Sequence, residues 1–380
     1  MKRLPLLLLL LAVPFPAAAH ADGCPPISCG TTSTTVPAGK TLLILSNGRY
    51  GPAKGIDLKT GRVRFSLPYG LVSADGLTYI AGARAKAART AVARFDAMTG
   101  RMRGGWSRPG RWTVSGVSAD GRRVVLTEYT KAPSVRVALF DGQRRTAKFA
   151  LAGNYELEAL SPDARRVFFI HWRRYGYDLK RYDIRTRRLE PTPLADPGEK
   201  MSGSPLGAVA SRDGHWLLTL YIEADGGSFV HALDLRTGVG HCIDLPLVGD
   251  FGSVGATALT LSPDQKRLYL ASPLLGRLTT VDLRWLRVAR VTRFRPSSPN
   301  DFDAGVAPSA AVTPNGRMLA FSGERRLWLY DAAFAIVRPV IRTTDMIAGL
   351  GFSPDGRRVL TVPSRGRASA FDASTGRRLG

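Results

Sequence analysis

A short turn sequence recurs along the chain at a nearly constant interval, and this recurrence constrains the fold more than any other feature. Its clearest copy is Ser353-Pro354-Asp355-Gly356, which lies between two apolar, strand-like runs. Proline presets φ at the second turn position, aspartate tolerates the bridge region, and glycine supplies the positive φ that lets the flanking strands pair. Each copy therefore predicts a β-hairpin.

Six further copies precede this one, with spacings of 45, 43, 50, 51, 51 and 40 residues; they begin at Ser73, Ser118, Ser161, Ser211, Ser262 and Thr313. About 20 residues after each turn, an apolar strand ends in Asp, and Thr-Gly often follows, as in Phe371-Asp372-Ala373-Ser374-Thr375-Gly376. A period of this size with strand-like content is typical of propeller blades. We therefore predict an all-β fold, a β-propeller of four-stranded antiparallel blades.

The strands that end in Asp indicate the number of blades. Eight of them occur, ending at Asp57, Asp96, Asp141, Asp183, Asp234, Asp282, Asp331 and Asp372. Because they recur in every unit, these aspartates are interpreted as turn residues rather than catalytic carboxylates. Only seven first turns are clear, and the eighth is a degraded copy at 35–42. The sequence predicts eight blades over residues 37–380, with seven and an irregular first unit as the alternative.

Ring closure is expected to involve the N-terminal segment. The last unit stops at Gly380, directly after its second turn. We expect its outer strand to come from residues 27–32, which would leave no sheet edge exposed.

The first 21 residues have the features of a signal peptide. Lys2 and Arg3 precede a short apolar run at 6–13, and Ala19 and Ala21 provide the small residues that a signal peptidase reads. The run is too short to span a bilayer, and no later segment approaches a spanning length. We expect a secreted or cell-envelope protein with no transmembrane segment after cleavage.

Two cysteines follow the expected cleavage point. Cys24 and Cys29 lie five residues apart within the segment 22–36. In an exported chain this spacing predicts a local disulfide that stiffens the N-terminal segment. Lipid anchoring at Cys24 is the alternative.

The chain is strongly basic, with 54 Lys and Arg against 30 Asp and Glu and a formal charge of +24. One interpretation is a surface for an anionic partner. The other is a GC-rich genome, which enriches Arg, Ala, Gly and Pro together, and the spread of arginines through every segment favours it. Export and this spread both disfavour nucleic acid as the partner.

The Ser-Pro-Asp-Gly turns and the Arg-Arg-apolar strands after them, as at Arg357-Arg358-Val359-Leu360, resemble the TolB-type and YVTN-type relatives of WD-repeat propellers. The resemblance covers nearly all of the chain after the signal peptide. It departs from the WD pattern because no Trp-Asp dipeptide closes the third strand. It implies an exported binding scaffold and says little about the partner.

Loop length indicates where a partner would bind. In a propeller blade with strands a to d, the a–b and c–d turns lie on one face, and the b–c and d–a connections lie on the other. The first set is uniformly tight here and the second is long and varied, so the second face is the predicted binding surface. Two b–c loops, 81–91 and 171–177, provide the predicted ligand-binding residues: Arg84, Arg89, Trp172, Arg173, Arg174 and Tyr175.

Aromatic rings beside guanidinium groups suit a sugar, a polyanion or an acidic protein loop. The alternative for Trp172 and its neighbours is an ordinary solvated loop whose Trp packs under the blade rim.

Catalytic signals are weak. The chain has no G-x-S-x-G nucleophile elbow and no HExxH-type histidine pair, so no catalytic residue, cofactor or metal site is predicted. The sequence predicts a monomeric binding scaffold for a protein or an anionic cell-envelope polymer. A propeller enzyme of quinoprotein or lactonase type is the alternative, because Phe95-Asp96-Ala97-Met98-Thr99-Gly100 with Trp106 resembles a tryptophan-docking repeat.

Overall fold

The computed structural model describes residues 41–379 apart from 45–52, 58–59, 61, 86–87, 131–132, 174–175, 196–201, 298–307, 324, 339–340 and 364–366. The described chain forms eight antiparallel sheets, each built from strands that follow one another in sequence. The expected signal peptide, the Cys24–Cys29 disulfide and the closing strand at 27–32 lie outside these residues.

The first four sheets are the blades of the N-terminal half. They contain β1 (Thr41–Ile44), β2 (Ala53–Asp57) and β3 (Val63–Leu67); β4 (Gly70–Val72), β5 (Thr78–Ala85), β6 (Arg89–Asp96) and β7 (Met102–Pro109); β8 (Thr113–Val117), β9 (Arg123–Tyr129), β10 (Ser134–Asp141) and β11 (Arg144–Ala152); and β12 (Tyr155–Leu160), β13 (Arg166–Trp172), β14 (Tyr177–Asp183) and β15 (Arg188–Pro191).

The remaining four sheets complete the set. They contain β16 (Ser204–Ala210), β17 (Trp216–Ile222), β18 (Ser228–Asp234) and β19 (Gly240–Leu245); β20 (Ala258–Leu261), β21 (Arg267–Ser272), β22 (Arg277–Asp282) and β23 (Arg287–Arg293); β24 (Ala310–Val312), β25 (Met318–Gly323) and β26 (Arg326–Asp331) with an outer strand in two pieces, β27 (Ile336–Val337) and β28 (Ile341–Arg342); and β29 (Ile347–Phe352), β30 (Arg358–Pro363) and β31 (Ser369–Asp372). One short helix, α1 (Phe251–Gly255), lies in the connection between β19 and β20.

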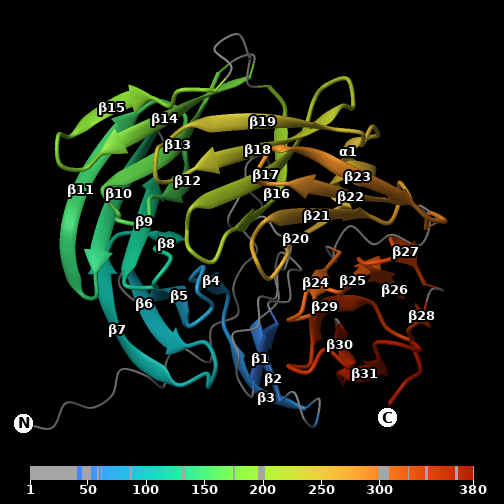
Figure 1. Ribbon diagram of the computed structural model, residues 1–380. Coiled ribbons are helices and arrows are strands. Elements are labelled where there is room, and N and C mark those ends of the chain that lie inside the picture. The colour runs from blue at the N-terminus through green and yellow to red at the C-terminus, as the bar shows by residue number, and fades with distance from the viewer. Residues whose placement is uncertain are drawn as a thin grey trace, which may run out of the picture.

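The eight sheets follow one another around a ring, so the fold is an eight-bladed β-propeller (Figure 1). The inner strands of neighbouring blades lie side by side, and β1 of the first blade lies against β29 of the last. Fully buried Ile56 of β2 packs with Leu360 and Val362 of β30 in one apolar cluster, so the first and last blades close the ring by hydrophobic contact. Eight blades are confirmed, and seven is wrong.

The last blade begins its own outer strand. Arg378 forms a bridge with Phe371, and the N–H of Leu379 donates to the carbonyl of Ala370 at 2.8 Å. The last residues of the chain therefore supply the start of the outer strand, and the expected contribution of residues 27–32 lies outside the described residues.

The repeated first turn is held by the same hydrogen bonds in all seven described copies. The buried Ser or Thr hydroxyl donates to the Asp or Asn side chain two residues later, at 2.5–2.7 Å. In the blade of β16–β19, the N–H of Trp216 donates back to Ser211 Oγ at 2.8 Å. Burying a hydroxyl costs little when it both donates and accepts, so the motif satisfies its own polar groups.

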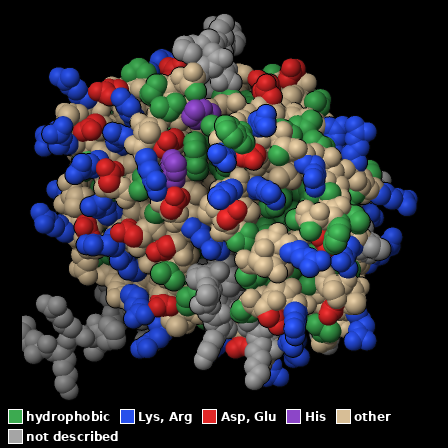
Figure 2. Space-filling model, viewed as in Figure 1, with side chains coloured by type: hydrophobic (Ala, Val, Ile, Leu, Met, Phe, Trp, Pro, Cys, Tyr) green, Lys and Arg blue, Asp and Glu red, His purple; other side chains and the backbone are tan. Residues whose placement is uncertain are grey.

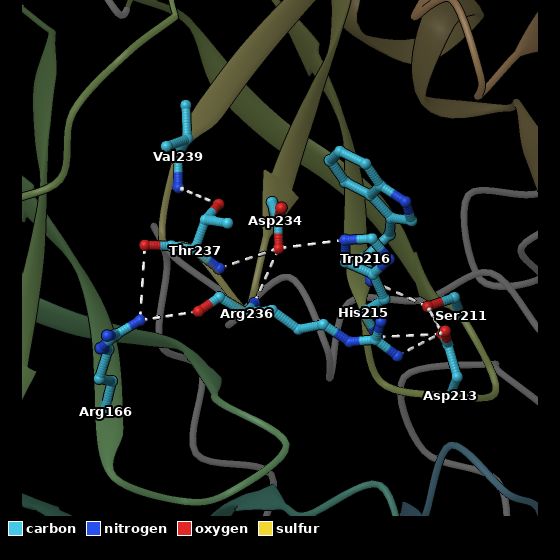
Figure 3. A network of polar contacts seen from close by, with 9 residues as sticks. All are labelled: Arg166, Ser211, Asp213, His215, Trp216, Asp234, Arg236, Thr237 and Val239. Atoms are coloured by element: carbon cyan, nitrogen blue, oxygen red, sulfur yellow. Dashed lines mark hydrogen bonds and ion pairs between the residues drawn. The ribbon is translucent and has the colours of Figure 1, made fainter.

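The second turn is equally self-contained. All eight third strands end at the Asp predicted from the sequence. In the turn after β14, the N–H of Thr186 donates to Asp183 at 2.7 Å, which lowers the pKa of this carboxyl. Figure 3 shows the two turns of one blade joined, because Arg236 donates to Asp213 at 3.1 Å and His215 lies 3.2 Å from Asp234. These carboxylates therefore hold the turns together through hydrogen bonds and ion pairs.

One predicted loop is wrong. Residues 81–91 were expected to form a long b–c loop, but β5 runs to Ala85 and β6 begins at Arg89, with the two strands paired along their length. Arg84 and Arg89 therefore lie on strands rather than in a loop.

A left-handed residue lies four positions after the Asp in the second turns of the second blade and of the fourth to eighth blades, whereas the third blade has its positive φ at Gly142, directly after Asp141. Glycine fills this position at Gly100 and Gly238, but Arg187 fills it in the fourth blade with φ of 58°. A non-glycine residue in this region costs about 1–2 kcal/mol, and glycine loses about 0.5–1 kcal/mol through unfolded-state entropy.

We expect Arg187→Gly to raise the free energy of unfolding by about 0.5–1 kcal/mol, since the relief of strain exceeds the entropy loss. Urea denaturation measures it. Arg185→Gly is the matched control, because this arginine is also exposed in the same turn but does not have a positive φ. Equal or lower stability of Arg187→Gly would show that the strain is not there to be relieved.

Candidate functional site

The predicted ligand-binding residues whose side chains the structure describes lie in two different blades. Arg89 is in the second blade, where its Nη2 donates to Ser107 Oγ at 3.0 Å and to the Ser107 carbonyl at 3.2 Å. It is anchored to the neighbouring strand. Trp172 and Arg173 are in the fourth blade, and Arg174 and Tyr175 lie outside the described residues, as does the side chain of Arg84.

Trp172 and Arg173 lie where β13 ends and the connection to β14 begins. The indole Nε1 of Trp172 donates to Glu156 Oε2 at 3.0 Å, and its ring meets Tyr177 edge-on at 5.5 Å. Arg173 donates to Asp178 Oδ2 from Nε at 2.9 Å and lies 2.7 Å from it through Nη2. We call Glu156, Trp172, Arg173, Tyr177 and Asp178 the Trp172 cluster.

The electrostatics of the Trp172 cluster are balanced at its surface. Arg173 and Asp178 are each about half exposed, and Lys180 lies 3.7 Å from the same carboxylate oxygen. Partial burial favours a higher pKa for Asp178, but the hydrogen bond and charge of Arg173 outweigh it and hold the pKa below its usual range. The site thus presents a cation and an anion together rather than an unpaired cation.

Beneath this surface lie two buried glutamates that the sequence analysis did not single out. Glu156 and Glu158 alternate along the inner strand β12, and Glu158 is fully buried. Its Oε1 accepts from Thr219 Oγ1 of the fifth blade at 3.3 Å. The available signal was positional: the described inner strands of the other blades contain no charged residue.

Glu158 occupies a special backbone position. The pairing of β12 with β13 shifts between Leu157 and Ala159, so Glu158 is the bulged residue. The bulges of the third, fifth and eighth blades place Ser115, Leu206 and Ala348 at this position. Bulges re-aim a side chain, and here the bulge directs a carboxyl toward the next blade.

Burial displaces the protonation equilibria of this region. It raises the pKa of Glu158 to about 8, with a further contribution from the charge of Glu156. It also raises the pKa of Glu156, which the Trp172 donor partly offsets. A carboxyl kept away from water favours its neutral form.

His231 is the third group in this region whose pKa is shifted by burial. It lies opposite Thr219 in the pairing of β17 with β18, and burial, with a contribution from His241, lowers its pKa to about 3. Neither ring nitrogen has a hydrogen-bond partner among the described residues. Perturbed groups of this kind gather at functional sites more often than elsewhere.

The comparisons with known proteins establish the fold alone. No protein-family profile matches the chain, and no curated protein matches it. The dihydro-heme d1 dehydrogenase NirN, solved in complex with DHE, is similar with a TM-score of 0.55 and 14% identity over 94% of this chain and 76% of that one. The crystal structure of a eukaryotic initiation factor is similar with a TM-score of 0.52 and 14% identity, over 93% of this chain and 89% of that one. The hydrazine synthase of Kuenenia stuttgartiensis has a TM-score of 0.45 and 14% identity, over 80% of this chain and 94% of that one.

The first two of these neighbours are a dehydrogenase and an initiation factor. Both are similar to this chain as propellers, so the likeness supports the architecture and leaves the function open.

The surface charge shows no single basic patch in the visible face. Figure 2 shows Lys and Arg side chains over all of it, with Asp and Glu between them. Among the described residues, no group of three or more His, Cys, Asp or Glu side chains is placed to hold a metal ion. The described chain also lacks a helix of the length and apolar content needed to cross a membrane.

We expect Glu158→Gln to remove a pH dependence of stability. Between the ordinary pKa of 4.5 and the folded value of about 8, the unfolded chain releases a proton that the folded chain keeps, so rising pH destabilises the wild type. The free energy of unfolding of the variant relative to wild type should therefore rise by more than about 1 kcal/mol from pH 5 to pH 8.

Urea denaturation across this pH range measures the difference. His231 acts in the opposite direction, gaining stability as pH rises from about 3 to 6.5, but it is present in both proteins and cancels. Glu190→Gln, at a half-exposed carboxylate of β15, should keep the wild-type slope. A Glu158→Gln curve parallel to wild type would contradict the burial argument.

Proposed function

We propose that this chain is a binding scaffold that engages a protein partner through the Trp172 cluster of its fourth blade. One observation carries this proposal. Exposed Arg173 and Asp178 are paired beside the Trp172 and Tyr177 rings, and buried Glu156 accepts a hydrogen bond from Trp172. Burying an unpaired carboxylate oxygen is costly, and Glu156 Oε1 has no partner among the described residues. Burial also raises the pKa of Glu156, and groups with displaced pKa values cluster at functional sites.

The paired charges favour a protein over an anionic polymer at this site. Arg173 Nη2 lies 2.7 Å from Asp178 Oδ2, so a polyanion would have to displace this carboxylate in order to bind Arg173. A protein surface offers both an acceptor for Arg173 and a donor for Asp178, so the pair is used as it stands. Trp, Tyr and Arg are also the residues that dominate protein interfaces.

The expected setting of this scaffold is outside the cytoplasm. The signal-peptide features of residues 1–21 and the cysteine spacing of Cys24 and Cys29 support export and a disulfide in the N-terminal segment. The Ser-Pro-Asp-Gly repeats support a relationship to TolB-type and YVTN-type propellers, whose resemblance implies a binding role.

Retention on isolated cell envelope tests the proposal. We expect Arg173→Glu to reduce retention about five-fold or more, because two acidic side chains would then repel each other and the partner's acceptor would lose its donor. The charge-swapped double variant Arg173→Glu with Asp178→Arg restores the pair in reverse and should recover part of the loss.

Arg165→Glu is the control, since Arg165 is exposed on the tight-turn face of the same blade. Protease treatment of the envelope before mixing should abolish retention of the wild type. Undiminished retention of Arg173→Glu, or retention on protease-treated envelope, would refute a protein partner at this cluster.

A second candidate function is a propeller enzyme, as in the quinoprotein or lactonase alternative. Glu156, Glu158 and His231 are the observation that favours it, because two carboxyls and an imidazole with displaced pKa values lie at one blade junction. The absorbance spectrum and metal content of the purified chain test it. A bound chromophore or a stoichiometric metal would favour the enzyme, and the lack of both would count against it.

A further inference from the structure

A groove opens on the side wall of the ring, between the second and third blades. It has a volume of about 280 Å³ and lies between β7 on one side and β10 and β11 on the other. Three cations, Arg108, Arg145 and Lys148, line it together with the aromatic rings of Trp112 and Phe140. This groove is in different blades from the Trp172 cluster, so it is independent of the function proposed above.

The cations of the groove lack acidic partners. Arg108, Arg145 and Lys148 make no ion pair with any carboxylate of the described chain, and no acidic side chain lines the groove. Arg108 lies over the Phe140 ring at 4.8 Å and makes only a long contact, 3.5 Å, with the Gln143 carbonyl. Three like charges that face one cavity repel one another, and a bound anion would remove this repulsion.

The position of Arg145 departs from the repeat. In each blade, the residue before the turn Asp pairs across to the outer strand, and Arg145 is the partner of Phe140. In blades one, two, four, five, six and seven the partner is apolar or glycine: Val63, Met102, Leu189, Gly240, Val288 and Val337. The last blade has Arg378 in a single bridge. The third blade therefore has a cation at a position that is apolar or glycine in six of the other seven blades.

An unpaired donor lies beside the groove. Trp106 of β7 packs against Phe140 with ring centroids 5.9 Å apart, and its Nε1 is buried without an acceptor among the described residues. At the next junction the same outer-strand face is closed, because Phe149 stacks on Tyr182 at 3.8 Å. The second and third blades are thus joined less tightly than the third and fourth.

We propose that this groove binds a small organic phosphate, a phosphate monoester carried on a sugar ring. A phosphate monoester carries about two negative charges and three acceptor oxygens, which matches guanidinium donors from Arg108 and Arg145 with Lys148 as a point charge. Trp112 and Phe140 supply the flat apolar surfaces on which the ring rests. The volume is near the lower limit for ligand pockets, which suits one sugar unit rather than a polymer.

Isothermal titration calorimetry on the full chain at low salt tests this assignment, with glucose 6-phosphate, inorganic phosphate and glucose as probes. We expect glucose 6-phosphate to bind more tightly than inorganic phosphate, and glucose not to bind. The double variant Arg145→Gln with Lys148→Gln should weaken the binding of glucose 6-phosphate at least ten-fold. Both side chains are exposed, so their replacement leaves the core intact. Raising the salt should weaken binding to the wild type more than to this variant.

Arg287→Gln with Arg290→Gln is the matched control, because both residues are exposed on the outer strand β23 of the sixth blade, with the same spacing. This control should bind glucose 6-phosphate as the wild type does. Trp112→Ala should remove the preference for glucose 6-phosphate over inorganic phosphate.

Three outcomes would overturn the proposal. They are the absence of heat with every phosphate probe, equal weakening by the control pair, and binding to phosphatidylcholine–phosphatidylglycerol vesicles with none to glucose 6-phosphate. The last would assign the groove to a membrane surface.

Discussion

The burial of both faces of every blade is the constraint on which the rest of this structure depends. A four-stranded sheet with two apolar faces is stable only when a neighbour covers each face, and this requires a closed ring. Ile56 of the first blade meets Leu360 and Val362 of the last, so closure is achieved by side-chain packing between the two ends of the described chain. Each junction between blades is therefore a place where a polar residue carries a cost.

Two junctions carry a charged or titratable residue at a register position that is uncharged in most other blades, and the proposed sites lie in or beside them. Between the fourth and fifth blades, Glu158 reaches Thr219 and is kept neutral by burial. Between the second and third blades, Arg145 and Lys148 line a groove that apolar packing does not fill. These departures can be recognised because the same register position can be compared from blade to blade.

The carboxylates on the tight-turn face of the ring have a structural role within the turns. Apart from Asp141, the turn aspartates accept hydrogen bonds from their own turns, as Asp183 does from Thr186 and Asp355 from Ser353. A carboxylate already supplied with donors has little left to offer a ligand. The sites proposed above accordingly lie in the long connections and at the junctions between blades.

The sequence by itself determined the fold, the eight third strands and the turn role of their aspartates, because turn chemistry is local and its repetition reports the period. It also placed Trp172 and Arg173 on the face of long connections. Only the tertiary structure decided that Arg89 is tied to Ser107, that Arg173 is paired with Asp178, and that Arg145 faces Arg108 across a groove. These outcomes depend on which residues of separate strands and blades meet, and the spacing within one repeat contains no information about the neighbour it will face.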